Sequence, residues 1–282
     1  MNKKAWLILS DGTKLEGISF GAETEVTGEI VFATNMTGFQ ESLTDPNFRG
    51  QILVQTFPLV GNVGVNQENI MSESGACGLV VREYCDQPSN FREVGTLSEF
   101  MKQRGIAGIS GIDTRRLTRI LREGGEMTAV ISASPEIEIP LVNTNCEFTE
   151  IYSAEIAEMK KRIDSKQPIF AVEQEHLFLA AAMGGEIYKL PNGHRGCNQP
   201  VKDLRTGNVY VTKQAHGYAV RSIPADVGEV IFENVNDKTI EGIKYKSISA
   251  FSTQFMPSEN GGGRNTLFLQ EEFKTMEGEI CR

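Results

Sequence analysis

Short apolar runs alternate with Gly, Asp and Asn turns over roughly the first third of the chain, a pattern typical of β-strands. The predicted strands are Ala5–Leu9, Lys14–Ser19, Gly28–Ala33, Gln51–Thr56 and Gly78–Val81. Residues 34–47 between two of these strands are polar and rich in turn formers, which predicts a loop that could reach a ligand or partner.

Helical periodicity then appears twice before the first half ends. Leu97–Arg104 is amphipathic and is followed by a terminating glycine. Asp113 has the chemistry of an N-cap for a helix over residues 114–122. Met127–Ala133 has the composition of a last strand. The pattern therefore predicts an α+β domain over residues 1–138 and a second domain over residues 139–282.

The second half begins with a charged helix, Ser153–Asp164, and then an apolar run, Ile169–Val172, which we interpret as a buried parallel strand. An alanine-rich helix is predicted over Leu177–Met183. The turn between this strand and helix is short. In α/β enzymes such a turn presents a nucleophile, because the helix N-terminus stabilises a developing anion. The residue at this turn is Glu173.

The remainder of the second half predicts a sheet, a polar loop and one more helix. Residues 193–200 are polar and glycine-rich, which predicts the loop. The expected strands are Glu186–Leu190, Val209–Thr212, Glu229–Asn234, Gly242–Tyr245 and Ala250–Gln254. A helix is expected over Leu267–Phe273. The second domain is therefore predicted to be α/β.

Composition and charge exclude several classes of protein. Hydrophobic residues make up 40% of the chain and charged residues 23%, which is typical of a globular protein. The formal net charge of −9 disfavours binding to nucleic acid or to an anionic membrane. No apolar run approaches the roughly 20 residues of a membrane span. Five cysteines without CxxC spacing fit a reducing compartment, so we expect a cytoplasmic protein without a disulfide framework or zinc site.

Six segments carry a resemblance that covers nearly the whole chain. Three resemble the amino-terminal domain of the carbamoyl-phosphate synthetase small subunit, namely residues 28–46, 56–66 and 108–115. Three others resemble the class I glutamine amidotransferase domain of the same subunit, namely residues 193–203, 216–220 and 251–257.

The resemblance implies an activity and a partner. Subunits of this family hydrolyse glutamine and pass ammonia to a large synthetase subunit, which uses ATP and bicarbonate to make carbamoyl phosphate for pyrimidines and arginine. The chemistry needs a cysteine thiolate at the elbow, a histidine base, a glutamate that orients the histidine, and an oxyanion hole. It implies no resident cofactor in the small subunit.

The sequence departs from the family at each catalytic position. Glu173 replaces the nucleophilic cysteine, Met256 replaces the histidine and Ser258 replaces the glutamate. The oxyanion loop has no counterpart, and residues 143–149 stand roughly in its place. The segment between the domains is also too short for a βαβ unit of roughly 30 residues that the family has there. The second domain should therefore be truncated, and an exposed sheet edge could favour self-association.

Positions that contact glutamine in the family have also changed. Asn47 stands where the family usually has serine, whereas Gly217 and Tyr218 still fit. We expect these three residues to line the former glutamine pocket. Ala215 replaces an asparagine, and Gln174 and Leu177 replace a leucine and a glutamine.

Three uses of the polar residues remain open from the sequence. Glu173 could be a nucleophile or base, but a solvated or ion-paired residue at an inactive elbow is favoured. Glu173, Glu175 and His176 could bind a metal with His194 or His216, but their spacing matches no signature, so structural histidines and no metal are expected. Cys197, beside an arginine, is a weak replacement nucleophile.

Three functions follow from these interpretations. The favoured hypothesis is a structural or regulatory partner of a large subunit, or of a relative of one, without glutaminase activity. The second is an enzyme with altered chemistry that uses Glu173 with His176 or His216. The third is a stand-alone binding scaffold. Co-purification of a large subunit would separate the first from the third.

Overall fold

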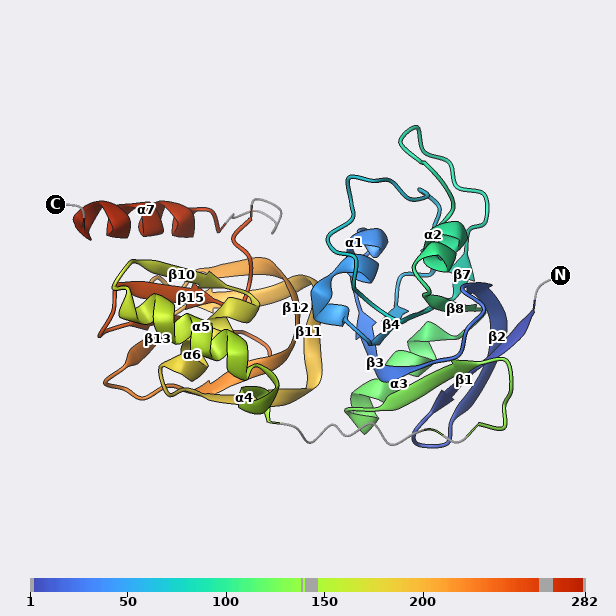
Figure 1. Cartoon of the computed structure of the whole chain (residues 1–282), viewed down its shortest axis with the longest axis horizontal. Coiled ribbons are helices and arrows are strands. Elements are labelled where there is room, and N and C mark those ends of the chain that lie inside the picture. The colour runs from blue at the N-terminus through green and yellow to red at the C-terminus, as the bar shows by residue number, and fades with distance from the viewer. Residues whose placement is uncertain (1–2, 138, 140–146, 259–265, 281–282) are drawn as a thin grey trace. The chain divides into compact units, whose positions relative to one another are not determined.

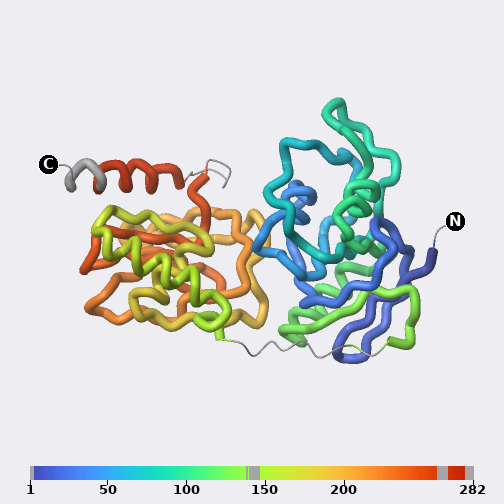
Figure 2. Tube along the Cα trace, in the orientation of Figure 1, coloured from blue at the N-terminus to red at the C-terminus, as the bar shows by residue number. Residues whose placement is uncertain are grey.

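The computed structural model describes residues 3–137, 139, 147–258 and 266–280, with the side chains of 277–280 excepted (Figure 1). The chain divides into two compact units, Met1–Asn143 and Thr144–Arg282. Figure 2 follows the chain through the first unit, blue to green, before it enters the second, yellow to red. The predicted domain boundary lies between residues 138 and 139. Residues 138 and 140–146 are outside the described part of the chain, so this boundary stays a prediction.

The first unit is built around a closed barrel with the strand order β1-β2-β8-β6-β4-β3-β9. The strands are β1 (Lys4–Leu9), β2 (Lys14–Gly21), β3 (Val26–Ala33), β4 (Ile52–Gln55), β6 (Gly78–Val80), β8 (Ala107–Ser110) and β9 (Thr128–Ser132). The run from β3 through β4 and β6 to β8 is parallel, and the remaining pairs are antiparallel. Closure leaves the barrel without an unpaired edge.

Helices and short strands surround this barrel. They are α1 (Phe39–Thr44), η1 (Pro46–Phe48), β5 (Leu59–Val60), β7 (Glu83–Tyr84), α2 (Leu97–Gln103) and α3 (Thr114–Gly124). Leu117 and Leu121 of α3 join the barrel core, where Leu7, Ile52 and Ile109 are fully buried. The predicted N-cap is confirmed, because the Asp113 carboxylate accepts a 2.9 Å hydrogen bond from the Arg116 N–H.

The prediction of a loop over residues 34–47 was wrong in part. Phe39–Thr44 forms α1, and η1 starts at Pro46. Phe39 and Leu43 are buried. The two apolar residues are four positions apart and therefore lie on one face of a helix. Burial of that face stabilises a helix whose polar residues alone suggested a turn.

The second unit contains a six-stranded sheet with the order β10-β15-β14-β12-β11-β13. Its strands are β10 (Ile169–Val172), β11 (Glu186–Asp203), β12 (Val209–Ser222), β13 (Gly228–Asn234), β14 (Ile240–Tyr245) and β15 (Ala250–Thr253). The helices are α4 (Phe148–Ile151), α5 (Ser153–Asp164), α6 (Gln174–Ala182) and α7 (Phe268–Ile280). Strands β10 and β15 are parallel, and the other neighbours are antiparallel.

Side-chain alternation along β10 divides the core of the second unit into two clusters. Ile169 and Ala171 pack in the cluster that contains α5 and α6. Phe170 points to the other face, where its ring centroid lies 5.7 Å from that of Phe273 in α7. The sheet is therefore covered by α5 and α6 on one face and by α7 on the other, as the ribbon in Figure 1 shows.

Three predicted elements of the second unit need correction. Residues 193–200 are not a loop but the middle of β11, which pairs with β12 through several register shifts. The polar residues of this stretch are held by interstrand hydrogen bonds, which override a turn-like composition. Strand β12 runs on to Ser222, well past the predicted end at Thr212. The last helix extends beyond the predicted Phe273 to Ile280.

The predictions around the elbow were partly right. Strand β10 has its predicted bounds, is parallel to β15 and lies at the edge of the described sheet. The helix after it begins at Gln174, three residues before the predicted start. Among the described residues, no helix combines the length and the apolar composition needed to cross a membrane.

Candidate functional site

The turn from β10 into α6 places Glu173 at a strained backbone position. Its φ is 53° and its ψ is −119°, a conformation that non-glycine residues rarely adopt. The Glu173 N–H donates to Thr253 O at 2.9 Å, and the Gln254 side-chain amide donates to Glu173 O at 3.2 Å. Both bonds tie the turn to the end of β15. The sharp strand-turn-helix geometry of a nucleophile elbow is therefore present, and a carboxylate occupies it.

Met256 and Ser258 follow β15, the strand that pairs in parallel with β10. The carboxyl ends of the two strands therefore meet at one edge, which also carries Glu173. The Met256 side chain is 44% exposed, and Ser258 N–H donates to Thr266 Oγ1 at 3.0 Å. A thioether cannot accept a proton from a nucleophile at neutral pH, so these side chains offer no base relay to Glu173.

His176 lies one turn into α6 and is completely buried. Its Nδ1 is 2.7 Å from Ser252 Oγ, and its Nε2 has no hydrogen-bond partner. Burial lowers the pKa of His176 to about 3, so the ring is neutral at physiological pH. Glu175 forms a 2.9 Å ion pair with Arg162 of α5. Its carboxylate is engaged in this ion pair.

The residues predicted to line the former glutamine pocket lie in different units. Asn47 is in η1, where its N–H donates to Asp45 Oδ1 at 2.9 Å. Gly217 and Tyr218 are in β12. A Cβ at Gly217 would lie 3.0 Å from the Arg195 guanidinium, so a side chain there would crowd the arginine. Each residue is described within its own unit, and the shared pocket stays a prediction.

A buried polar network in the second unit brings together residues that the sequence did not connect. His194 of β11 and His216 of β12 are register partners, and their ring centroids are 4.9 Å apart. Glu241 of β14 is fully buried beside them, with Oε1 3.3 Å from His194 Nδ1. In the described part of the chain, these three form the one group of three side chains whose donor atoms could hold a metal ion.

Gln214 and Asp237 complete this network. Gln214 Oε1 lies 3.1 Å from His194 Nδ1 and 3.0 Å from His216 Nε2, while its amide Nε2 donates to Glu241 Oε2 at 2.8 Å. Asp237 Oδ2 is 2.8 Å from His194 Nε2. The family-like segments contain both histidines, and Gln214 lies two residues before His216, but nothing in the sequence relates these residues to Glu241. That relation comes from the pairing of β14.

Charges around the two histidines shift their pKa values in opposite directions. Burial alone lowers the pKa of His194, but hydrogen bonds and charges from Asp237 and Glu241 outweigh it and raise the pKa to about 9. Burial, helped by His194 and Arg195, holds the pKa of His216 well below its ordinary value. Burial alone would raise the pKa of Asp237, but the hydrogen bond and charge of His194 and the hydrogen bonds from Thr239 outweigh it and lower the pKa to about 2.

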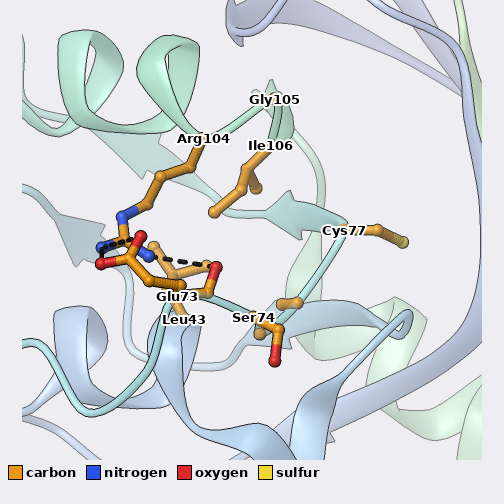
Figure 3. Close-up of a pocket in the computed structure, with 9 residues that line it drawn as sticks. Leu43, Glu73, Ser74, Cys77, Arg104, Gly105 and Ile106 are labelled. Carbon is orange, nitrogen blue, oxygen red and sulfur yellow. Dashed lines mark hydrogen bonds and ion pairs between the residues drawn. The ribbon is translucent and has the colours of Figure 1, made fainter.

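An open depression of about 220 Å³ lies in the first unit, lined by residues that include Glu73, Cys77 and Arg104 (Figure 3). Arg104 already donates to Ser72 O at 3.0 Å and to Glu73 Oε1 at 3.3 Å. Burial raises the pKa of the Cys77 thiol to about 11, so it stays protonated and unreactive. The depression therefore offers neither an unpaired cation nor a nucleophile.

Comparison with known proteins identifies the family. The model for the carbamoyl-phosphate synthase small chain, CPSase domain, matches residues 7–131, and that for glutamine amidotransferase class-I matches residues 142–276. The carbamoyl phosphate synthase small chain of Streptococcus agalactiae serotype III (strain NEM316) is 36% identical, over 97% of this chain and 98% of that one. The chain belongs to the carbamoyl phosphate synthase small chain family. The small chain of Clostridium perfringens (strain 13 / Type A) is 35% identical over 96% and 98% of the two chains.

The resemblance seen in the sequence is thereby confirmed. This small chain has the CPSase domain followed by the class I amidotransferase domain, in the order that the sequence predicted. Among solved structures, a glutamine amidotransferase from Thermotoga maritima matches with 16% identity and a TM-score of 0.34, over 52% of this chain and 70% of that chain. A similarity at that level does not assign a position or role to any individual residue.

Proposed function

We propose that this small chain does not hydrolyse glutamine and acts as a structural or regulatory partner of a large synthetase subunit in the cytoplasm. One observation carries the proposal. The elbow keeps the strained backbone on which the family's chemistry depends, and the side chain it presents is that of Glu173. A synthetase assembled with this chain would make carbamoyl phosphate, for pyrimidines and arginine, from free ammonia.

The chemistry of the described residues supports this proposal. A carboxylate is a much weaker nucleophile toward an amide than a thiolate, and it needs a protonated partner to expel the amine. His176 has no exposure to a substrate, which also disfavours an altered enzyme that pairs Glu173 with His176. Cys77 and Cys85 bond to backbone carbonyls in the first unit, and Cys197 is an exposed residue of β11.

A shortened second domain is part of the same proposal. The alignment to the Streptococcus agalactiae relative spans 351 positions, whereas this chain has 282 residues. At least 69 aligned positions of the relative therefore stand opposite gaps in this chain. Strand β10 pairs with β15 on one side and ends the described sheet on the other. A missing βαβ portion before β10 accounts for both observations. The oxyanion segment expected near residues 143–149 lies mostly outside the described residues.

Reconstitution with a large subunit tests the proposal. The purified chain is mixed with a carbamoyl-phosphate synthetase large subunit, and carbamoyl phosphate is measured with glutamine or with ammonium as nitrogen donor. We expect a stable complex, turnover with ammonium and none above background with glutamine. Robust glutamine-dependent turnover would overturn the loss of glutaminase activity, and failure to form a complex would overturn the partner role.

Two variants sharpen the reconstitution experiment. Glu173→Cys restores a thiol at the elbow, but Met256 and Ser258 still cannot activate it, so we expect no gain in glutamine hydrolysis. Glu173→Gln removes the carboxylate while keeping its shape. Ammonium-dependent turnover of the complex should be the same for both variants and for the wild type. A loss in Glu173→Gln alone would assign the carboxylate a chemical role.

A further inference from the structure

The strongest unexplained feature is the network of His194, His216, Glu241 and Gln214, because one of its contacts joins two hydrogen-bond acceptors. His216 Nδ1 lies 2.7 Å from Tyr218 O, and a carbonyl oxygen only accepts, so Nδ1 carries the ring hydrogen. His216 Nε2 then presents a lone pair to Gln214 Oε1 at 3.0 Å. Two acceptors at that distance repel each other.

Rotating the Gln214 amide does not remove the conflict. In the exchanged orientation, the amide oxygen would face Glu241 Oε2, now 2.8 Å from the amide nitrogen. A proton on His194 Nδ1 would satisfy its contacts with Gln214 and Glu241, but it would leave His216 Nε2 facing an oxygen. Protonating both rings would place two cations side by side in a buried site, which is costly.

A divalent metal ion satisfies all four atoms at once. Zinc bonds of about 2.0–2.2 Å in a tetrahedron separate the ligand atoms by about 3.3–3.6 Å. The observed separations are 3.3 Å from His194 Nδ1 to Glu241 Oε1, 3.1 Å from His194 Nδ1 to Gln214 Oε1, and 3.0 Å from His216 Nε2 to Gln214 Oε1. The donor atoms of the two histidines and Glu241 all lie within 4.8 Å of one another. A tetrahedral ion would bring these atoms to separations of about 3.3–3.6 Å.

Neighbouring groups orient each ligand so that a lone pair points toward the proposed metal position. His194 directs Nε2 at Asp237 Oδ2, and His216 directs Nδ1 at Tyr218 O, so each ring can donate its remaining hydrogen outward while the other nitrogen points inward. Glu241 is oriented by Thr239 Oγ1 at 3.0 Å and by Asn234 Nδ2 at 3.3 Å. The Arg195 guanidinium lies against Gly193 and Gly217 of the same two strands.

We propose that His194 Nδ1, His216 Nε2, Glu241 and Gln214 Oε1 form a structural site for a divalent first-row metal, zinc fitting best, in the second unit. Imidazole nitrogens and a carboxylate oxygen are ligands that zinc takes in proteins. Four protein ligands leave no open position for a substrate, so the site is structural rather than catalytic. It would join β11, β12 and β14, three strands of one sheet.

Metal analysis of the full chain tests the proposal. The protein is stripped with chelator, titrated with Zn²⁺ alone and measured by calorimetry and elemental analysis, and Co²⁺ is used as a spectroscopic substitute. We expect one Zn²⁺ per chain, a rise in Tm on binding, and the visible absorption bands of tetrahedral Co²⁺. Absence of a stoichiometric Zn²⁺ site, or a Co²⁺ spectrum of octahedral type, would overturn the proposal.

Matched variants assign the ligands. Glu241→Gln and His216→Gln should abolish the binding of Zn²⁺ at concentrations that saturate the wild type. Asp237→Asn removes an outer partner of His194 and should weaken binding about 10- to 100-fold. His176→Asn is the control, because it removes the third histidine of the chain outside the network. Equal Zn²⁺ affinity in His216→Gln and His176→Asn would show that binding is adventitious and overturn the assignment.

Discussion

At the scale of single residues, the elbow separates backbone geometry from side-chain chemistry. Glu173 has a φ of 53°, and its N–H is fixed by Thr253 O. This geometry is imposed by β10, by β15 and by the helix that follows, and it holds a carboxylate at the turn. The backbone of a nucleophile elbow is therefore compatible with a glutamate side chain at this position.

His176 makes the stability of the chain depend on pH. Its pKa is about 3 in the folded chain, against 6.5 for an exposed histidine, so the unfolded chain takes up a proton between these values that the folded chain does not. Stability therefore falls as the pH drops below 6.5, by up to about 1.4 kcal/mol per pH unit. The His176→Asn variant should lack this contribution, and its denaturation midpoint should fall less steeply between the two pKa values.

Chemical denaturation of both proteins across this range checks the prediction. The low pKa of His216 acts in the same direction, but it is present in both proteins and cancels in the comparison. Parallel pH profiles for wild type and His176→Asn would show that the ring of His176 is not held neutral by burial.

At the scale of elements, the long β11–β12 ribbon is the part of the second unit where composition and structure diverge. The stretch that contains His194 pairs directly with the stretch that contains His216. Gly193 makes this approach possible, because a Cβ there would lie 2.4 Å from His216 O. A glycine that suggests a loop in the sequence is in fact required for close contact between two strands.

The Gly193→Ala variant should destabilise the second unit by about 1–3 kcal/mol, because a backbone carbonyl cannot move away as a flexible side chain can. Gly95→Ala is the matched control, since the nearest atom to a Cβ there is 3.6 Å away, an ordinary contact. Urea denaturation of the two variants and the wild type measures the difference. Equal stability of the two variants would contradict the close approach at Gly193.

At the scale of the whole molecule, the two units differ in how their sheets end. The first unit closes its barrel, whereas β10 terminates the described sheet of the second unit with one paired side. An edge strand with apolar residues is a template for pairing with another chain. This is the physical basis for expecting self-association when no large subunit is present.

A charge on the edge should suppress that association. We expect the wild-type chain to associate as its concentration rises, and the Val172→Lys variant to stay monomeric, because edge lysines oppose strand pairing. Val209→Lys is the control, since Val209 is an exposed residue of β12, which is paired within the sheet. Sedimentation velocity over a concentration series measures the association of the wild type and of both variants. A wild type that stays monomeric at every concentration, or equal association of both variants, would exclude pairing along β10 as the cause of self-association.

The family, the order of the two domains and most strands could be predicted from the sequence, whereas the replacement of the catalytic residues by Glu173, Met256 and Ser258 stays a prediction. These features depend on local composition and on residues close together in the chain, where periodicity and motif spacing carry the information. The N-cap at Asp113 and the bounds of β10 belong to the same class. Each is fixed by neighbours within a few residues.

Which distant residues meet became known from the folded chain alone. The fold made residues 193–200 a strand, and it brought Glu241 to His194 and His216. Strand pairing joins residues tens of positions apart, and no local pattern encodes which strands become neighbours. The physical reason is that interstrand hydrogen bonds and burial, which set the sheet order, are properties of the assembled core rather than of any one segment.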